Sequence, residues 1–342
     1  MCEKEEKVYL TWTEQVDKLK KRNMAFTSKE NEKNAAYILQ NNSYYALVNG
    51  YKDILGVISV NEEDNYNGAL FDDLKEAYDF DKNISSILFK YLLRIEDSIK
   101  AIFSHYIAKT YGHKNYDYLT HYNYRKGKQL RDSQKFERDK LLEKLNKPIE
   151  INRDLQIIHY NEDYGYVPPW VLVSCISLDV LNFWFKLSNR KIKKDVVKTI
   201  LYDYEQYPFV SITDLEENIE LFSEGFKLIK EYRNRAAHGN RIINHTSKHN
   251  LNINSILKYV PNREEIISLY DTGGLRGDIM SVFVLVLIML SKRSTLSTSF
   301  INELEAEFDK LNNTNPNLYK KILKQTKIPD NFLDILRNIT YI

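Results

Sequence analysis

Residues 213–239 have the sequence TDLEENIELFSEGFKLIKEYRNRAAHG, and this stretch is the strongest indication of the fold. Large apolar side chains recur in it at steps of four and three, the spacing of one buried face of an α-helix. They are Leu215, Ile219, Phe222, Phe226 and Ile229. Gly239 follows the periodic segment and is a typical C-terminal cap. We therefore predict a long amphipathic helix over residues 213–238.

The end of this helix combines an arginine, an asparagine and a histidine. The next step of four falls on Arg233, and a guanidinium there is costly unless an anion, a carboxylate or a partner subunit meets it. Asn234 and His238 are four residues apart and share a face. Arg233 is rotated from His238 by roughly 140°, so only its long side chain could reach the same ligand. Two interpretations stay open, a catalytic group or basic residues that complement the helix dipole.

Three other segments have the pattern of buried helices. Asp81 or Asn83 could cap a helix at 83–111, and Pro168-Pro169 starts another helix at 170–188. The apolar stripe of the first consists of Ile84, Leu88, Tyr91, Ile95, Ile99, Ile102 and Tyr106. A third helix, at 278–292, is apolar throughout. With the helix at 213–238 they would form a four-helix bundle.

The rest of the chain is predicted to be helical or irregular, which makes the fold class all-α. Strand-period patterns and internal repeats are not evident, and glycine and proline are scarce. The other predicted segments are an irregular connection at 113–130, a charged helix at 133–146, a loop-rich region at 240–275, and tail helices at 298–311 and 316–339 interrupted by Pro329. The predicted domains are an N-terminal helical region at 1–80, a helical core at 81–292 and a C-terminal helical tail at 293–342.

Composition narrows the class of protein. The net charge is only +2, so any affinity for nucleic acid must come from local basic patches. The longest apolar run, Ile279 to Leu290, is shorter than the roughly 20 residues that span a bilayer. The charged N-terminus lacks the apolar core of a secretory signal, and the two cysteines fit a reducing compartment. We expect a cytoplasmic protein that is not associated with membranes.

Four sequence blocks resemble a known family. The pattern R-N-x-x-x-H from Arg233 to His238 resembles the signature of the HEPN superfamily of α-helical ribonucleases. Three upstream blocks resemble, in order, those of the Abi-like abortive-infection proteins of the AbiD and AbiF types. These blocks are Tyr44-Tyr45 with Gly50-Tyr51, Phe71-Asp72-Asp73-Leu74 with Ala77-Tyr78-Asp79-Phe80-Asp81, and Val167-Pro168-Pro169-Trp170-Val171-Leu172-Val173. The resemblance extends from about residue 10 to about residue 245 and implies a HEPN-like four-helix core.

The third block departs from the family pattern after Trp170. The family often continues into a glutamate and then Phe-Gly, whereas this chain has Ser174 and Leu178-Asp179. This departure argues against a carboxylate function at position 174. The residues of the R-N-x-x-x-H pattern are unaffected.

The resemblance implies a metal-independent endoribonuclease without a cofactor that acts in phage defence or as a toxin. RNA supplies its own nucleophile, the 2′-OH, and histidine, with a reference pKa of about 6.5, can transfer protons near neutral pH. His238 would have that role, Arg233 would hold the scissile phosphate, and Asn234 would orient either of them. The expected products are a 2′,3′-cyclic phosphate and a 5′-hydroxyl end.

One histidine is too few for both proton transfers. In the superfamily two such motifs meet across a pair of bundles, so a single copy predicts a homodimer with an isologous interface near Arg233. A second candidate is the pair Lys100 and His105 on the helix at 83–111, which could equally be solvated surface. Glu96 and Asp97 on that helix could pair with Arg233 when no RNA is bound, or could simply be solvated.

Two basic clusters could bind RNA, although charge runs are more often solvated surface. The first interleaves aromatic rings with cations, as single-strand binding requires. It contains Tyr122, Tyr124, Arg125, Lys126, Lys128 and Arg131. The second is a compact run of Arg190, Lys191, Lys193 and Lys194. His245 and His249 have no partners at metal-ligand spacing, so we predict no metal site.

Two other functions stay open beside the ribonuclease. The first is a non-catalytic member of the family that binds RNA or a protein through the same bundle. The second is nucleotide transfer to or from a partner, although no nucleotidyltransferase motif is visible. An active toxin would need restraint, so a small RNA or protein antitoxin is expected by analogy.

Overall fold

The structure is a computed structural model that describes residues 8–60, 63–131, 134–201, 215–290 and 294–340. These residues are largely helical, which confirms the all-α prediction. A short antiparallel hairpin joins β1 (Ile58–Val60) to β2 (Glu63–Asn65), with Ser59 opposite Asp64. The predicted helix ends at residues 213 and 292 and the start at residue 133 lie outside the described residues.

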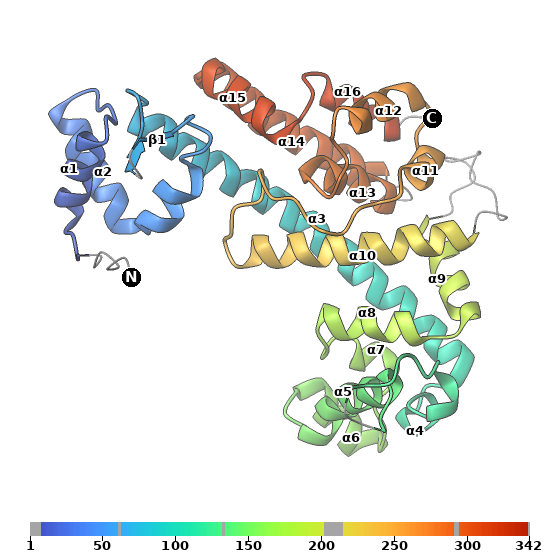
Figure 1. Cartoon of the computed structure of the whole chain (residues 1–342). Coiled ribbons are helices and arrows are strands. Elements are labelled where there is room, and N and C mark those ends of the chain that lie inside the picture. Colours follow the sequence, from blue (N-terminus) through green and yellow to red (C-terminus); the bar gives the residue numbers. More distant parts are fainter. Residues whose placement is uncertain (1–7, 61–62, 132–133, 202–214, 291–293, 341–342) are drawn as a thin grey trace.

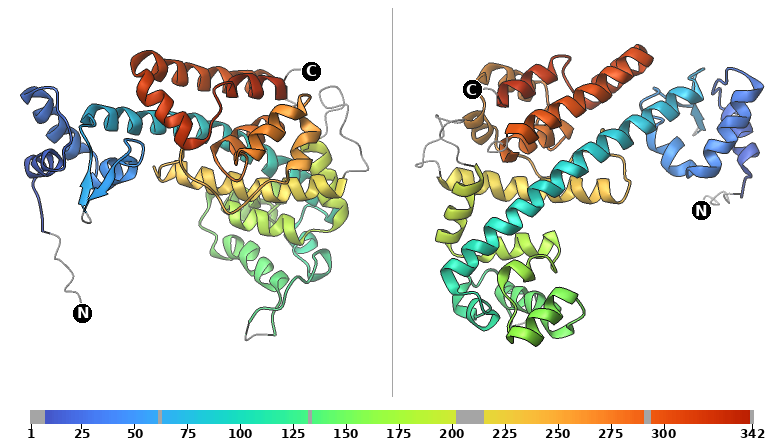
Figure 2. Two further views of the ribbon diagram at one scale, coloured as in Figure 1. Left: turned by 45° about the horizontal axis from the view of Figure 1, so that its top comes forward. Right: turned by 180° about the vertical axis from the view of Figure 1, so that it is seen from behind.

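One helix runs through the whole molecule. Helix α3 (Phe71–Tyr111) has 41 residues and is about 60 Å long at 1.5 Å per residue. Figures 1 and 2 show it as a diagonal that carries the N-terminal elements at its start and a second group of helices at its end. It begins at Phe71, so the predicted start near Asp81 or Asn83 is wrong. The predicted domain boundary at residue 80 lies inside this continuous helix.

The N-terminal elements are packed at the start of α3. They are α1 (Trp12–Lys21), α2 (Lys29–Asn41), the π-helix η1 (Tyr45–Asn49) and the hairpin. Thr11 begins α1 with a capping box, since its hydroxyl accepts from the Glu14 N–H and the Glu14 carboxylate accepts from the Thr11 N–H.

The segment after α3 folds around the distal end of that helix. Its elements are α4 (Asn115–Tyr118), η2 (His121–Asn123), α5 (Glu137–Ile151), α6 (Leu155–Tyr164), α7 (Pro169–Leu172), α8 (Leu178–Leu187) and α9 (Arg190–Leu201). The single helix predicted at 170–188 is wrong. The chain turns after Leu172, and Ser177 caps a new helix by accepting from the Val180 N–H.

The C-terminal half carries the predicted long helix and the tail. Its elements are α10 (Leu215–Ala237), α11 (Ile253–Ile256), η4 (Leu257–Tyr259), α12 (Arg263–Asp271), α13 (Ile279–Leu290), α14 (Ser294–Thr314), α15 (Pro316–Thr326) and α16 (Phe332–Thr340). The break at Pro329 is confirmed. Helix α12 lies in the region predicted to be loop-rich.

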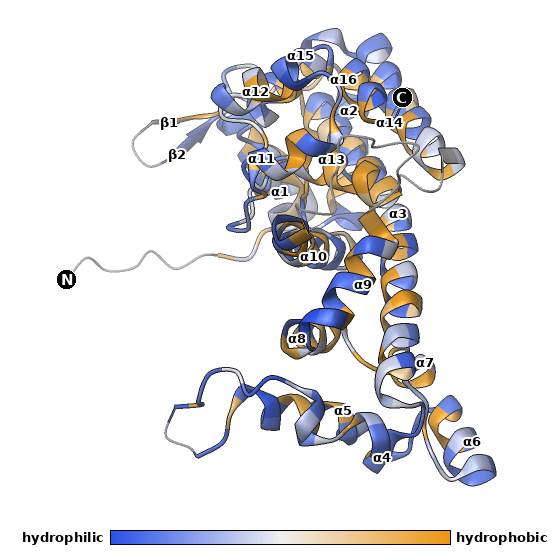
Figure 3. Ribbon diagram, turned by 90° about the vertical axis from the view of Figure 1, so that its right-hand side faces the viewer, coloured by the Kyte–Doolittle hydropathy of each residue, from blue (hydrophilic) through white to orange (hydrophobic). Residues whose placement is uncertain are grey.

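The core forms where α10 crosses α3. Helix α9 packs on both, α8 packs along the middle of α10 between Phe222 and Lys230, and α13 packs on α3 and α10. The predicted set of four helices therefore omits α9. All of α13 is buried, and Figure 3 shows it as a hydrophobic helix among amphipathic neighbours. Gly225 lets α10 approach α13 closely, because a Cβ there would lie 2.9 Å from the Leu285 Cδ1.

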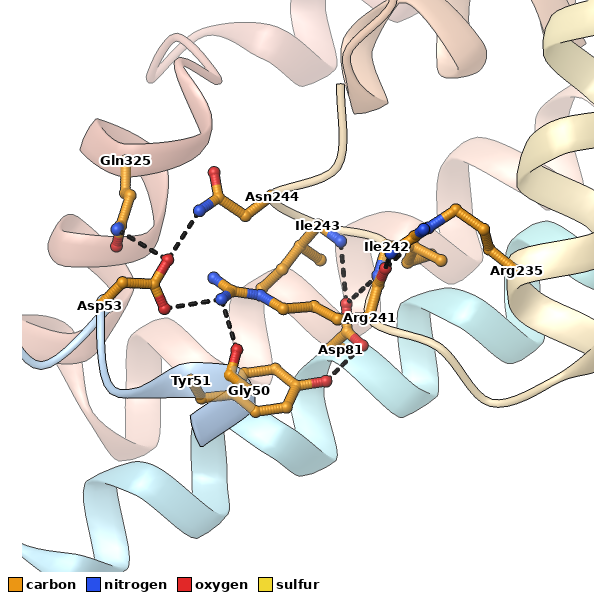
Figure 4. Close-up of polar contacts among 10 residues, drawn as sticks. All are labelled: Gly50, Tyr51, Asp53, Asp81, Arg235, Arg241, Ile242, Ile243, Asn244 and Gln325. Carbon is orange, nitrogen blue, oxygen red and sulfur yellow. Dashed lines mark hydrogen bonds and ion pairs between the residues drawn. The ribbon is translucent and has the colours of Figure 1, made fainter. Parts of the chain in front are cut away.

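Asp81 is a buried carboxylate in the body of α3 and caps no helix. It accepts a hydrogen bond from the Tyr51 hydroxyl at 2.6 Å and from the backbone N–H groups of Ile242 and Ile243 at 3.0 and 2.8 Å (Figure 4). Burial and the Asp81 charge raise the pKa of Tyr51. Asp81 thus ties the segment that follows α10 to α3 and to the N-terminal elements.

Arg241 extends this connection. Its guanidinium donates to the Asp53 carboxylate at 2.6 Å and to the Gly50 carbonyl, and lies 4.8 Å from the centre of the Tyr51 ring. Asp53 also accepts from Asn244 at 2.8 Å and from Gln325 of α15 at 3.1 Å (Figure 4). Three distant parts of the chain meet at one set of polar contacts just beyond the end of α10.

Replacing the buried carboxylate should destabilise the protein strongly. Asp81→Asn removes the charge that three donors face, so we expect the free energy of unfolding to fall by about 2–4 kcal/mol in urea titrations. Asp79→Asn is the matched control, because its half-exposed carboxylate pairs only with Lys75 in the described contacts. Equal effects of the two substitutions would contradict the importance of the Asp81 contacts.

Candidate functional site

Helix α10 ends in a well-defined turn at Gly239. The Gly239 N–H donates to the Ala236 carbonyl at 3.1 Å and the Asn240 N–H donates to the Arg235 carbonyl at 2.9 Å, the pair of bonds of a Schellman motif. Gly239 has φ of 65°, in the left-handed region that glycine tolerates. His238 is the last residue before this turn, and its side chain is exposed. The backbone at His238 is therefore fixed while the imidazole faces solvent.

Arg233 is paired with a buried carboxylate. Its Nε lies 3.2 Å from the Glu96 Oε2, and the other Glu96 oxygen is 2.7 Å from the Lys100 ammonium. The Glu96 side chain is 5% exposed, whereas that of Arg233 is 30% exposed. The Arg233 contact lies within ion-pair distance without the alignment of a hydrogen bond, so the attraction is mainly electrostatic. Of the two interpretations left open for Glu96 and Asp97, the structure shows pairing with Arg233 for Glu96 and an exposed side chain for Asp97.

Asn234 touches the same guanidinium. The Arg233 Nη1 donates to the Asn234 Oδ1 at 3.3 Å, and the Phe89 ring lies 5.9 Å from the guanidinium carbon. Among the described residues, no side chain is hydrogen-bonded to the His238 imidazole. The structure thus brings Arg233 and Asn234 together and leaves His238 open to a ligand.

Sequence reasoning missed Lys82 and Arg241 at this end of α10. The Lys82 ammonium donates to the Gly239 carbonyl and lies 5.0 Å from the centre of the Tyr78 ring. Arg235 donates from Nε and Nη2 to the Arg241 carbonyl at 3.1 and 2.7 Å. For Lys82, the sequence signal that could have pointed to this role is its position directly after the block that ends in Asp81.

The auxiliary candidate residues on α3 do not all lie at the end of α10. Lys100 shares Glu96 with Arg233 and so belongs to this cluster. His105 is exposed, with its ring against Tyr106 at 5.2 Å, and the rise from Lys82 to His105 is about 35 Å along the same helix. Asp97 is exposed on the same helix. Within one chain, His105 therefore lies far from the Gly239 end of α10, which Lys82 contacts.

The first predicted RNA-binding cluster is partly buried. Tyr124 is 4% exposed, its hydroxyl donates to the Tyr118 carbonyl at 2.7 Å, and its ring packs on Tyr111. It cannot stack on a base, so this part of the prediction is wrong. Tyr122 is 98% exposed. The cationic side chains of the cluster are also exposed: Arg125, Lys126, Lys128 and Arg131.

The second predicted cluster lies in the first half of α9. Arg190 pairs with Glu216 at the start of α10. Lys191 is exposed, whereas Lys193 and Lys194 are half-buried. This cluster is next to α10 but at the end opposite to His238.

The two histidines beyond α10 pair with its glutamates. His245 Nε2 is 2.6 Å from Glu231, which also accepts from the Ser247 hydroxyl at 2.6 Å, and His249 is 3.7 Å from Glu224. Burial lowers the pKa of His245. In the described part of the chain, no group of three or more His, Cys, Asp or Glu side chains is placed to hold a metal ion.

Comparison with known protein families gives a match over most of the first 244 residues. A family model described as Abi-like protein matches residues 37–244, which is more than half of the chain and includes Tyr51, Asp81 and Arg233 to His238. No curated protein and no solved structure matches significantly. No described helix combines the length and the apolar character needed to cross a membrane.

Glu96 should stabilise the folded protein through its two cations. Glu96→Gln leaves Arg233 and Lys100 without their carboxylate, and we expect the free energy of unfolding to fall by roughly 1–3 kcal/mol in urea titrations. Glu143→Gln is the control, because this exposed carboxylate of α5 pairs with the exposed Lys135 and should cost less than about 1 kcal/mol. An unchanged stability of the Glu96 variant would show that the pair contributes nothing.

Proposed function

The chain belongs to the Abi-like protein family, and from this premise we propose that it is an endoribonuclease that cleaves RNA at the end of α10. Family membership supports a role in abortive infection. The ribonuclease proposal adds the R-N-x-x-x-H pattern and its setting. The observation that carries it is an exposed imidazole, at His238, in the same helix end as an arginine held by a buried carboxylate.

The proposed chemistry needs cations near the phosphate and a group that moves protons. Arg233 makes its contact with Glu96 through Nε, so N–H donors of the guanidinium remain for a phosphate oxygen. Contact with Glu96 and Asn234 also restricts the side chain before RNA binds, which lowers the entropy that binding costs. The phosphate would lie between Arg233 and His238 while the 2′-OH attacks it.

His238 would transfer one proton, from the 2′-OH or to the leaving 5′-oxygen. The second transfer requires another group. We propose that a second copy of the chain supplies it across an isologous interface at the end of α10, so that the protein acts as a homodimer. A small RNA or protein antitoxin would restrain the toxin.

A non-catalytic function is the second candidate. The ion pair of Arg233 with Glu96 favours it, because a neutralised arginine can serve packing as well as catalysis. In that case the bundle would bind RNA or a protein without cutting it. Cleavage assays separate the two candidates.

The cleavage proposal has a direct assay. The purified protein should cut single-stranded RNA in excess EDTA and leave 2′,3′-cyclic phosphate and 5′-hydroxyl ends. His238→Ala should reduce the rate at least ~100-fold, because general acid–base groups contribute about 10²–10⁴. His159→Ala is the control, since this exposed histidine pairs with Asp163 on α6. Cleavage by the His238 variant at the normal rate would reject the site.

The proposed dimer can be measured by sedimentation at micromolar concentration. We expect a dimer, and mixing His238→Ala chains with wild-type chains should lower the activity more than in proportion to the fraction of variant. A monomer that still cleaves would place the second proton-transfer group in the same chain. Lys82, at the Gly239 carbonyl, would then be the nearest candidate on α3.

A further inference from the structure

The two basic clusters, distant in sequence, meet at the C-terminal end of α8. The Lys193 ammonium of α9 donates to the Lys186 carbonyl at 2.6 Å. The backbone N–H of Arg125 donates to the carbonyl of the next residue, Leu187, at 2.9 Å. Carbonyls at the end of a helix carry partial negative charge and attract cations. This attraction accounts for the Lys193 contact, whereas the loop around Arg125 is held to the same helix end by a backbone hydrogen bond.

Positive charge at this point exceeds what its neighbours neutralise. Burial, together with the charges of Arg125 and Lys186, lowers the pKa of Lys193 to about 8. Glu216 of α10 opposes this shift but is engaged by Arg190. In the described part of the chain, no carboxylate lies within ion-pair distance of Arg125 or Lys193.

Nearby contacts leave N–H donors available to a ligand. Lys186 pairs with Glu137 at 2.7 Å. This carboxylate supplies one negative charge beside the three positive charges of Arg125, Lys186 and Lys193. The Lys193 ammonium lies 5.8 Å from the centre of the Phe185 ring and uses one of its donors on the Lys186 carbonyl. Two donors remain. An anion placed here would relieve the repulsion and accept from several cations, as a phosphate does.

We propose that Arg125, Lys186 and Lys193 form a binding site for the phosphodiester backbone of single-stranded RNA, separate from the cleavage site. This inference rests on the proposed function, since it names how the substrate is held. Tyr122, three residues before Arg125, is 98% exposed and offers a ring on which a base can stack. Arg190 joins the site to the start of α10 through Glu216.

The site lies far from His238 in one chain. From Glu216 to His238 the rise along α10 is about 33 Å, which corresponds to about ten stacked nucleotides at 3.4 Å each. A short RNA cannot occupy both places. Long single strands should therefore be held more tightly than short ones, and a dinucleotide should be cleaved without help from this site.

Binding is tested in the full chain with His238→Ala, so that the RNA stays intact. The probe is an unstructured RNA of about 20 nucleotides, measured by fluorescence anisotropy at several salt concentrations. Adding Lys193→Met to the His238→Ala chain should weaken RNA binding at least tenfold and reduce its salt dependence. Lys198→Met is the matched control, because Lys198 is a half-buried lysine of α9 rotated from Lys193 by roughly 140°.

Two further measurements distinguish an RNA-binding site from a structural cap, in which Lys193 only stabilises the C-terminal end of α8. A lysine whose pKa is lowered on folding opposes folding below that pKa, so Lys193→Met should leave thermal stability unchanged or raise it. RNA favours the charged lysine, so affinity should fall as pH rises through about 8, and Lys193→Arg should abolish this dependence. Lower stability with unchanged RNA affinity would overturn the proposal in favour of a cap.

Cleavage and binding can fail independently. If His238 proves irrelevant to cleavage while Lys193→Met still weakens RNA binding, the cleavage site is wrong and the binding site stands. If His238→Ala abolishes cleavage while Lys193→Met changes neither RNA binding nor cleavage of long strands, the binding site is wrong. If Lys193→Met leaves RNA affinity unaffected but abolishes binding to another protein, the RNA-binding site is also overturned.

Discussion

The structure depends on one buried negative charge, the carboxylate of Asp81. A buried carboxylate is tolerated only when donors surround it, and here they come from Tyr51 and from the backbone of Ile242 and Ile243. These donors belong to segments before and after α3. The charge therefore determines how the N-terminal elements and the chain beyond α10 are attached to the long helix.

This attachment has consequences for the end of α10. Arg233 is held from one side by Glu96, and Gly239 is held by Lys82, both on α3. The segment beyond Gly239 is bound to Asp81 through the N–H groups of Ile242 and Ile243, so the backbone around His238 is fixed at several points. The imidazole itself is exposed. A rigid backbone with an accessible side chain is the arrangement that a catalytic group requires.

Charge is distributed differently at the two ends of α10. At the Arg233 end, one buried carboxylate is shared by two cations. Near Glu216, at the other end, Lys193 has cationic neighbours and a lowered pKa. The net charge of +2 conceals this contrast, because neutralised and unneutralised cations count equally in a sum. Local excess charge, rather than the total, is what the proposed binding of a polyanion would depend on.

The sequence determined those features whose causes are local. The apolar period and Gly239 predicted the end of α10, the apolar run predicted α13, and Pro329 predicted the break before α16. Helix periodicity, caps and proline act within a few residues, so they can be read without the fold. The pairing of Glu96 with Arg233 was predictable only as one option, because many exposed carboxylates could have met that arginine.

Long-range contacts decided the rest. The sequence placed a helix cap at Asp81 or Asn83, whereas donors from distant segments make Asp81 a buried acceptor within the first third of α3. Tyr124 read as a surface ring but packs on Tyr111 in the core. The convergence of Arg125 with Lys193 depends on where α8 ends in space. Burial and charge neutralisation are properties of neighbours in three dimensions, and one-dimensional spacing does not specify those neighbours.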